Sequence, residues 1–216
     1  MARRRDFGRT WWGRAWVGAL ETRAVHDPNR LSRGRTYARK GTVGTLTIRA
    51  GRVTAEVHGS RPDPYDVLLE VRCLRPDEWE CVLDVVAARA GHAAALLDGE
   101  LHEGIVAEAS AVDVELLPRS GELRTACSCP DWAEPCKHAA AVCYLVADAL
   151  DDDPFLLLEL RGLGRAGVLA AVRERRAGSG EAAEVAVAGA GVPAAEAWVS
   201  ELSDDELAGL VALGRS

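Results

Sequence analysis

Residues 127–138 read Cys-Ser-Cys-Pro-Asp-Trp-Ala-Glu-Pro-Cys-Lys-His, a short stretch that contains three cysteines and one histidine. In an extended strand the side chains at i and i+2 share a face, so the thiols of Cys127 and Cys129 can point to one place. On a regular helix the same spacing would turn two side chains about 200° apart. Cys136 should therefore precede a helix, with His138 in its first turn. The pattern predicts a site where the end of a strand meets the start of a helix.

The residues around the motif favour the same arrangement. Pro130 and Asp131 are typical of a turn, and Pro135 disfavours helical geometry at the residue before it while tolerating a helix start. A helix is expected from Ala139 to Leu150, and Asp151-Asp152-Asp153-Pro154 should end it.

Three thiolates and one imidazole form a complete tetrahedral ligand set for zinc. The sequence therefore predicts one structural Zn²⁺ bound by Cys127, Cys129, Cys136 and His138. Arg124, Lys137 and the helix N-terminus would offset the negative charge of the site. No position is left for water, so we expect a non-enzymatic protein without a small-molecule substrate. Loss of the metal is expected to unfold the strand and helix around it, while the sheet upstream could survive.

The chain as a whole is typical of a cytoplasmic protein that does not contact a membrane. Its 216 residues are 48% hydrophobic, and no stretch approaches the roughly 20 apolar residues of a membrane span. Thiols in the cytoplasm stay reduced, so the six cysteines favour metal binding over disulfides. Cys143 is predicted to be packed in the core. Cys73 and Cys81 fall on apolar positions and are also predicted to be buried.

Upstream of the motif, alternating apolar residues predict a three-stranded antiparallel meander. The strands are expected around Leu46–Ile48, Val53–Val57 and Val67–Cys73. Asp77 should cap a helix that covers this sheet, and a second short helix should follow from His92 to Leu101. These positions of the covering helix are apolar: Trp79, Val82, Leu83, Val86 and Ala90.

A hairpin is predicted to lead into the motif, because Val112–Leu117 and Glu122–Cys127 flank the turn sequence Pro-Arg-Ser-Gly. Beyond the motif, Phe155–Arg161 and Val168–Arg176 are predicted short helices. Residues 177–195 are predicted to be a loose linker, before a last helix around Ser203–Glu206. The predicted fold class is thus α+β.

The N-terminal part of the chain carries tryptophans and positive charge. Trp12, Trp16 and Leu20 have the i, i+4, i+8 spacing of a helix, with Thr10 as its N-cap, and this spacing favours core residues over a base-stacking platform. Residues 29–41 lack an apolar period and are interpreted as a basic loop. Four of its side chains are candidates for contact with phosphate: Arg33, Arg35, Arg39 and Lys40. An ordinary solvated loop explains the same residues equally well.

Charge is divided unevenly along the chain. Residues 1–61 contain 14 Lys and Arg against 4 Asp and Glu, a formal charge of +10, whereas residues 62–216 contain 12 against 29, or −17. A basic front with aromatic side chains is compatible with a nucleic-acid partner, and an acidic rear would limit where that partner lies. One folded body with a mixed surface is the alternative.

The Cys-x-Cys-x6-Cys-x-His pattern, with Ser-Cys-Pro-Asp-Trp inside it, resembles the SWIM zinc finger at all four ligand positions. Three further stretches are similar to bacterial SWIM zinc finger proteins that occur beside Snf2-type helicases. They are Phe-Gly-Arg-Thr-Trp-Trp-Gly-Arg-Ala-Trp at 7–16, Tyr-Ala-Arg-Lys-Gly at 37–41 and Asp-Pro-Phe-Leu-Leu at 153–157. The resemblance implies a module that binds DNA, a protein, or both, and it implies a Snf2-type helicase as a partner.

We therefore expect three regions: a basic N-terminal α+β module (1–111), a SWIM-type zinc finger (112–150) and a C-terminal helical region (151–216). The expected function is interaction with nucleic acid, with protein, or with both. The main alternative is a pure protein adaptor, in which the basic segment folds against the acidic one. A zinc hydrolase would require a displaceable ligand. Salt dependence separates the first two hypotheses, because phosphate binding weakens steeply with added salt.

Overall fold

The computed structural model describes residues 6–24, 28–131 and 133–189. The chain forms two compact units, residues 1–175 and 176–216. All contacts described below lie in the first unit. The helix α8 (Arg165–Gly189) contains residues of both units.

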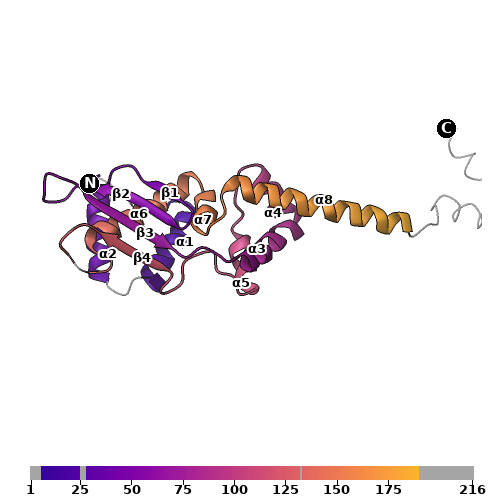
Figure 1. Cartoon of the computed structure of the whole chain (residues 1–216), viewed down its shortest axis with the longest axis horizontal. Helices are drawn as coiled ribbons and strands as arrows, with labels where there is room; N and C mark the ends of the chain where they lie inside the picture. The colour runs from indigo at the N-terminus through magenta and orange to yellow at the C-terminus, as the bar shows by residue number, and fades with distance from the viewer. Residues whose placement is uncertain (1–5, 25–27, 132, 190–216) are drawn as a thin grey trace, which may run out of the picture. The chain divides into compact units, whose positions relative to one another are not determined.

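Four strands form one antiparallel sheet in the order β1-β2-β3-β4 (Figure 1). The strands are β1 (Thr47–Arg49), β2 (Arg52–Val57), β3 (Tyr65–Val71) and β4 (Leu123–Cys127). Buried and exposed side chains alternate along β2 and β3, because successive side chains point to opposite faces of a sheet. The predicted mixed α and β class is confirmed, but the sheet has four strands where the sequence predicted three.

The extra strand belongs to the predicted finger. β4 pairs with β3, with Cys127 opposite Val67 and Leu123 opposite Val71. The strand that carries the first cysteine is therefore part of the main sheet, and the predicted metal-binding region shares that sheet with the upstream strands.

The predicted hairpin is wrong, since Val112–Leu117 forms no strand. Asp113 has a positive φ of 62°, which breaks extended geometry early in this segment. The carbonyl of Glu115 accepts a 2.6 Å hydrogen bond from Nη2 of Arg161, whose fully buried guanidinium also donates to the carbonyl of Arg72. The side chain of Arg161, which directly follows a helix at 155–160, thus satisfies backbone that the alternating sequence assigned to a strand pair.

The core is built around α6 (Lys137–Asp152), which covers one face of the sheet (Figure 1). The helices α1 (Trp11–Ala19) and α2 (Pro28–Arg39) pack against α6. The predicted tryptophan anchors are confirmed: Trp12 and Trp16 are buried, and the Trp16 indole donates a 2.9 Å hydrogen bond to the carbonyl of Cys143.

The start of the chain is fixed to the end of α6. Thr10 is the predicted N-cap of α1, and its hydroxyl accepts from the N–H of Gly13 at 3.3 Å. The carboxylate of Asp151 accepts hydrogen bonds from the N–H of Arg9 (2.6 Å) and from the N–H and hydroxyl of Thr10 (2.8 and 2.6 Å). One acidic side chain thereby joins the first helix to the central helix.

The predicted basic loop is wrong, because residues 28–39 form the helix α2. Its buried positions, Leu31, Gly34 and Ala38, recur at helical spacing. A Cβ atom at Gly34 would lie only 2.4 Å from Cβ of Ala140, so the two helices approach closely at this point. Two of the three buried residues are small and arginines stand between them, so the sequence shows no apolar stripe that would predict a helix.

The helices α3 (Pro76–Ala88), α4 (Ala90–Leu97) and α5 (Gly104–Ala111) form a second group. α3 packs against α4 and α5, whereas the sequence predicted that it covers the sheet. Its N-cap is Arg75, whose N–H donates to Glu78 at 2.8 Å, and Asp77 lies in the first turn. No signal in the sequence had indicated α5.

Among the cysteines outside the motif, only one prediction holds. Cys143 is fully buried in α6, as expected. Cys73 and Cys81 are exposed, so their predicted burial is wrong. Cys73 lies beyond the end of β3, and Cys81 lies beside the buried stripe of α3.

The C-terminal part begins with α7 (Phe155–Leu160), close to the predicted bounds. α8 continues to Gly189, so residues 177–189 are helical where a linker was predicted. Residues 190–195 and the predicted helix around Ser203–Glu206 lie outside the described residues. The expected domain boundaries stay predictions. None of the helices in the described ranges is long and apolar enough to cross a membrane.

Candidate metal centre

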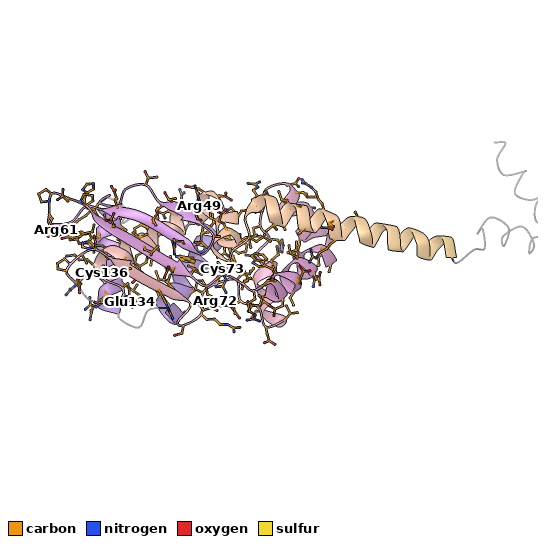
Figure 2. All side chains as sticks on the ribbon, in the orientation of Figure 1. Arg49, Arg61, Arg72, Cys73, Glu134 and Cys136 are labelled. Carbon is orange, nitrogen blue, oxygen red and sulfur yellow. The ribbon has the colours of Figure 1, made fainter. Side chains whose placement is uncertain are left out.

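The end of β4, the loop after it and the start of α6 bring three cysteines and one histidine together. β4 ends at Cys127, Cys129 follows two residues later, and Cys136 is the N-cap of α6. His138 is the second residue of that helix. This is the arrangement predicted from the spacing, and Figure 2 shows Cys136 beside the sheet.

The four candidate ligand atoms lie within 4.8 Å of one another. The distance between Sγ of Cys127 and Nδ1 of His138 is 3.8 Å. Tetrahedral zinc holds sulfur at about 2.3 Å and nitrogen at about 2.0–2.1 Å, which separates neighbouring ligand atoms by roughly 3.5–3.8 Å. The cluster of Cys127, Cys129, Cys136 and His138 therefore fits a structural Zn²⁺.

The imidazole of His138 is buried between two tyrosines. The Tyr65 ring stacks on it with a centroid distance of 4.6 Å, and the Tyr37 ring meets it edge-on at 5.2 Å. Burial, aided by the charge of Lys137, lowers the pKa of His138, which favours the neutral imidazole that binds metal. Its Nε2 is buried without a hydrogen-bond partner in the described residues, so neither ring nitrogen is committed to a competing strong partner.

Burial also raises the pKa of the Cys136 thiol and of the Cys127 thiol. Cys136 and Cys129 add to the rise in the pKa of Cys127, and Cys129 adds to the rise in the pKa of Cys136, where Cys127 acts in the opposite direction. The N–H of Ala139, in the first turn of α6, donates to Sγ of Cys136 at 3.4 Å. A divalent cation would relieve the repulsion among three thiolates, and its binding must release protons from them.

The loop between the two ligand pairs is held from three sides. The N–H of Thr125 in β4 donates to a carboxylate oxygen of Glu134 at 2.9 Å. Arg30 of α2 lies 3.3 Å from the carboxylate of Asp131. Ser128 exchanges two hydrogen bonds with the backbone of Asp66 in β3, at 2.9 and 3.0 Å. The metal ligands are thus positioned by the sheet and by two helices.

The structure separates the four candidate phosphate contacts into two pairs. Arg33 and Lys40 are exposed. Arg35 forms an ion pair with Glu21, and Arg39 forms one with Asp6 at 3.7 Å. The second pair is therefore occupied within the protein.

Two cations that the sequence analysis did not propose for phosphate binding lie beside the metal centre. Nζ of Lys137 lies 5.1 Å from the Tyr37 ring centroid, and the guanidinium of Arg61 lies 4.3 Å from that of Tyr65. Lys137 stands inside the motif and was assigned only to charge compensation. Arg61 is distant in sequence, and only the fold places it here. Arg124, which was expected to offset the charge, lies on the face of β4 opposite to Cys127, across from Glu70.

Comparison with known proteins identifies this region. Residues 112–147 match the family model of the SWIM zinc finger. The chain is also 42% identical over 169 residues to the uncharacterized protein Rv2102 of Mycobacterium tuberculosis. The match covers 78% of this chain and 60% of that protein, so the chain spans less than two thirds of its relative's length. No solved structure matches the protein.

Proposed function

Because residues 112–147 form a SWIM zinc finger, we propose that this protein is a zinc-stabilised interaction module that binds nucleic acid through basic side chains around the finger. We call Lys40, Arg61 and Lys137 the finger surface, and Arg33, exposed on α2, is a further candidate for contact with phosphate. The module carries no catalytic activity in this proposal, because a full set of four protein ligands leaves zinc no position for water.

One observation carries the proposal: cations gather on both tyrosines that flank the ligand His138. Lys40 and Lys137 lie 5.8 and 5.1 Å from the Tyr37 ring centroid, and Arg61 lies over Tyr65. In the described part of the protein, none of these three cations forms a salt bridge with a carboxylate. Cations held on aromatic rings and free of acidic partners are available to phosphate oxygens.

The chain's net charge of −7 does not oppose this proposal, since nucleic acid meets a local surface. The finger surface also explains why zinc would matter for binding. The metal fixes His138, the two tyrosines pack on that ring, and the cations rest on the tyrosines. Loss of zinc should therefore weaken binding without removal of a single basic residue.

The test is fluorescence anisotropy with labelled duplex and single-stranded DNA of about 20 nucleotides, beginning at about 50 mM salt. We expect binding that weakens with salt. The triple variant Lys40→Ala, Arg61→Ala, Lys137→Ala should lower the slope of log affinity against log salt by about 2–3 for duplex DNA, at roughly 0.9 per lost contact.

A matched control carries Arg89→Ala and Arg119→Ala, two exposed arginines outside the finger surface. It should bind DNA like the native protein. Absence of binding to both DNA forms at about 50 mM salt would leave the protein-adaptor function in its place. For that function a Snf2-type helicase, implied by the sequence resemblance, is the partner to test first.

A further inference from the structure

The face of the sheet opposite α6 carries a row of side chains that crosses all four strands, and all of them except Leu68 are short. Thr47 pairs with Thr54, Thr54 with Leu68, and Leu68 with Ala126. All four point away from α6, because their neighbours along β1, β2 and β3 are buried against the core and those along β4 are half-buried there. In Figure 1 no helix lies in front of this face of the strands.

The row lies at the bottom of a groove. Its side chains line an open cavity of about 750 Å³ that extends to Thr45 and Ser128. Leu68 is half-buried at the centre, flanked by smaller residues. Short side chains on a twisted sheet leave space that a partner's side chains can fill.

Charge is divided between the two borders of the groove. On one border Glu56 and Asp66 lie directly opposite each other and point outward. Like charges in such a pair are destabilising, and neither carboxylate has a cationic partner among the described residues. On the other border lie Arg49, Arg52 and Arg124, with Glu70 paired to Arg52 at 3.1 Å.

We propose that this groove is a docking site for an amphipathic helix of a protein partner. The helix has an apolar side chain over Leu68, a lysine or arginine on the flank that meets Glu56 and Asp66, and an acidic residue on the flank that meets the arginines. In this complex Glu56 and Asp66, which lie opposite each other, bind a cation of the partner.

The size of the face selects this occupant. Four strands spaced by about 4.8 Å, with about five residues each, present roughly 300 Å², and three turns of one helix of 10–12 Å diameter cover more than half of that area. A standard interface buries about 800 Å² from each partner, so this face alone is too small to hold a second copy in a stable dimer. Nucleic acid is disfavoured because Glu56 and Asp66 would repel phosphate. The proposal is independent of DNA binding at the finger surface.

The test uses three synthetic helical peptides of about 14 residues with the same central leucines, titrated into the isotope-labelled full chain. One peptide has lysine on one flank and glutamate on the other, one has lysine on both flanks, and one has glutamate on both. We expect the mixed peptide to bind at least tenfold more tightly than either uniform one. The shifted amide signals should be those of β1 to β4.

Variants make the test specific. Leu68→Asp should weaken the mixed peptide at least tenfold, and the double variant Glu56→Lys, Asp66→Lys should instead prefer the peptide with glutamate on both flanks. Asp63→Lys, the same change in an exposed turn, should behave like the native protein. Circular dichroism and zinc content check that each variant folds.

Equal binding of all three peptides would overturn the proposal. So would a peptide preference that the double variant does not change, or concentration-dependent self-association through these strands. Oligonucleotide binding that shifts the same strands, with no peptide binding, would also overturn it. Failure of DNA binding at the finger surface leaves each of these outcomes unaffected.

Discussion

Asp151 illustrates how much of this fold depends on single side chains. Burial alone would raise its pKa, but the hydrogen bonds from Arg9 and Thr10 outweigh burial, and the pKa lies below its usual value. A carboxylate whose pKa is lower in the folded state stabilises the fold at pH values above its ordinary pKa of about 3.9. This stabilisation is lost as the pH falls through the lower, folded value.

The variant Asp151→Asn should therefore lose about 1–3 kcal/mol of unfolding free energy at neutral pH, because its charged acceptor is gone while its shape remains. The difference from the native protein should shrink as the pH falls below about 4. Urea denaturation at several pH values measures both. Asp152→Asn is the control, since the Asp152 side chain is 80% exposed, and it should change little. A deficit that stays constant down to acid pH would contradict this role.

At the same scale, the metal ligands could be predicted because their spacing has a geometric meaning. Other residues could not. Cys73 and Cys81 stand at positions where the apolar pattern predicts core residues. Their exposure depends on where β3 ends and on which side of α3 is covered. Arg35 and Arg39 differ from Arg33 in the acidic and aromatic side chains that the fold brings to them, which the sequence does not reveal.

At the scale of elements, α2 is the clearest difference between prediction and structure. The sequence from 29 to 41 contains few large apolar residues, so periodicity gave no helix signal. The helix instead packs through small residues against the small residues of α6, where backbones approach closely. Close packing of this kind stabilises a helix as effectively as a leucine stripe, but it has no hydropathy pattern.

Gly34 should therefore be intolerant of any side chain. Gly34→Ala would place its Cβ 2.4 Å from Cβ of Ala140 and 2.8 Å from the backbone carbon of that residue. Overpacking of this kind costs about 1–3 kcal/mol. Gly18→Ala is the matched control, because nothing lies within 4 Å of a Cβ there. That change should raise stability by about 0.5–1 kcal/mol, and thermal denaturation compares the two. Equal stability of both variants would mean that α2 is not packed on α6.

At the scale of the whole first unit, the metal centre and the core share their elements. β4 carries Cys127 and completes the sheet, while α6 begins at the ligands and covers that sheet. Structural zinc contributes roughly 10–16 kcal/mol in small finger peptides, comparable with the 5–15 kcal/mol stability of a domain. The sequence alone suggested that the upstream sheet could survive metal loss. The shared elements indicate the opposite.

Zinc removal should accordingly destabilise the sheet and α6 together, as one cooperative unit, rather than unfold only the region around the ligands. With a chelator, or in Cys136→Ser, we expect hydrogen exchange protection to fall in β2 and β3 as well as in α6. Cys81→Ser is the control, because Cys81 is exposed and lies outside the motif. This variant and the native protein should both keep about one zinc per chain. Retained protection in β2 and β3 after chelation would show that the sheet is independent.

The hydrogen bond from Thr125 to Glu134 protects the protein against aggregation through the edge of its sheet. β4 lies at the margin of the sheet, where an unpaired N–H invites a strand from another molecule. Glu134, labelled in Figure 2, occupies one such N–H, and the zinc-held loop keeps it there. Zinc starvation would therefore do more than unfold the finger. It would expose the edge of β4 to pairing with other chains, which the loop prevents when zinc is bound.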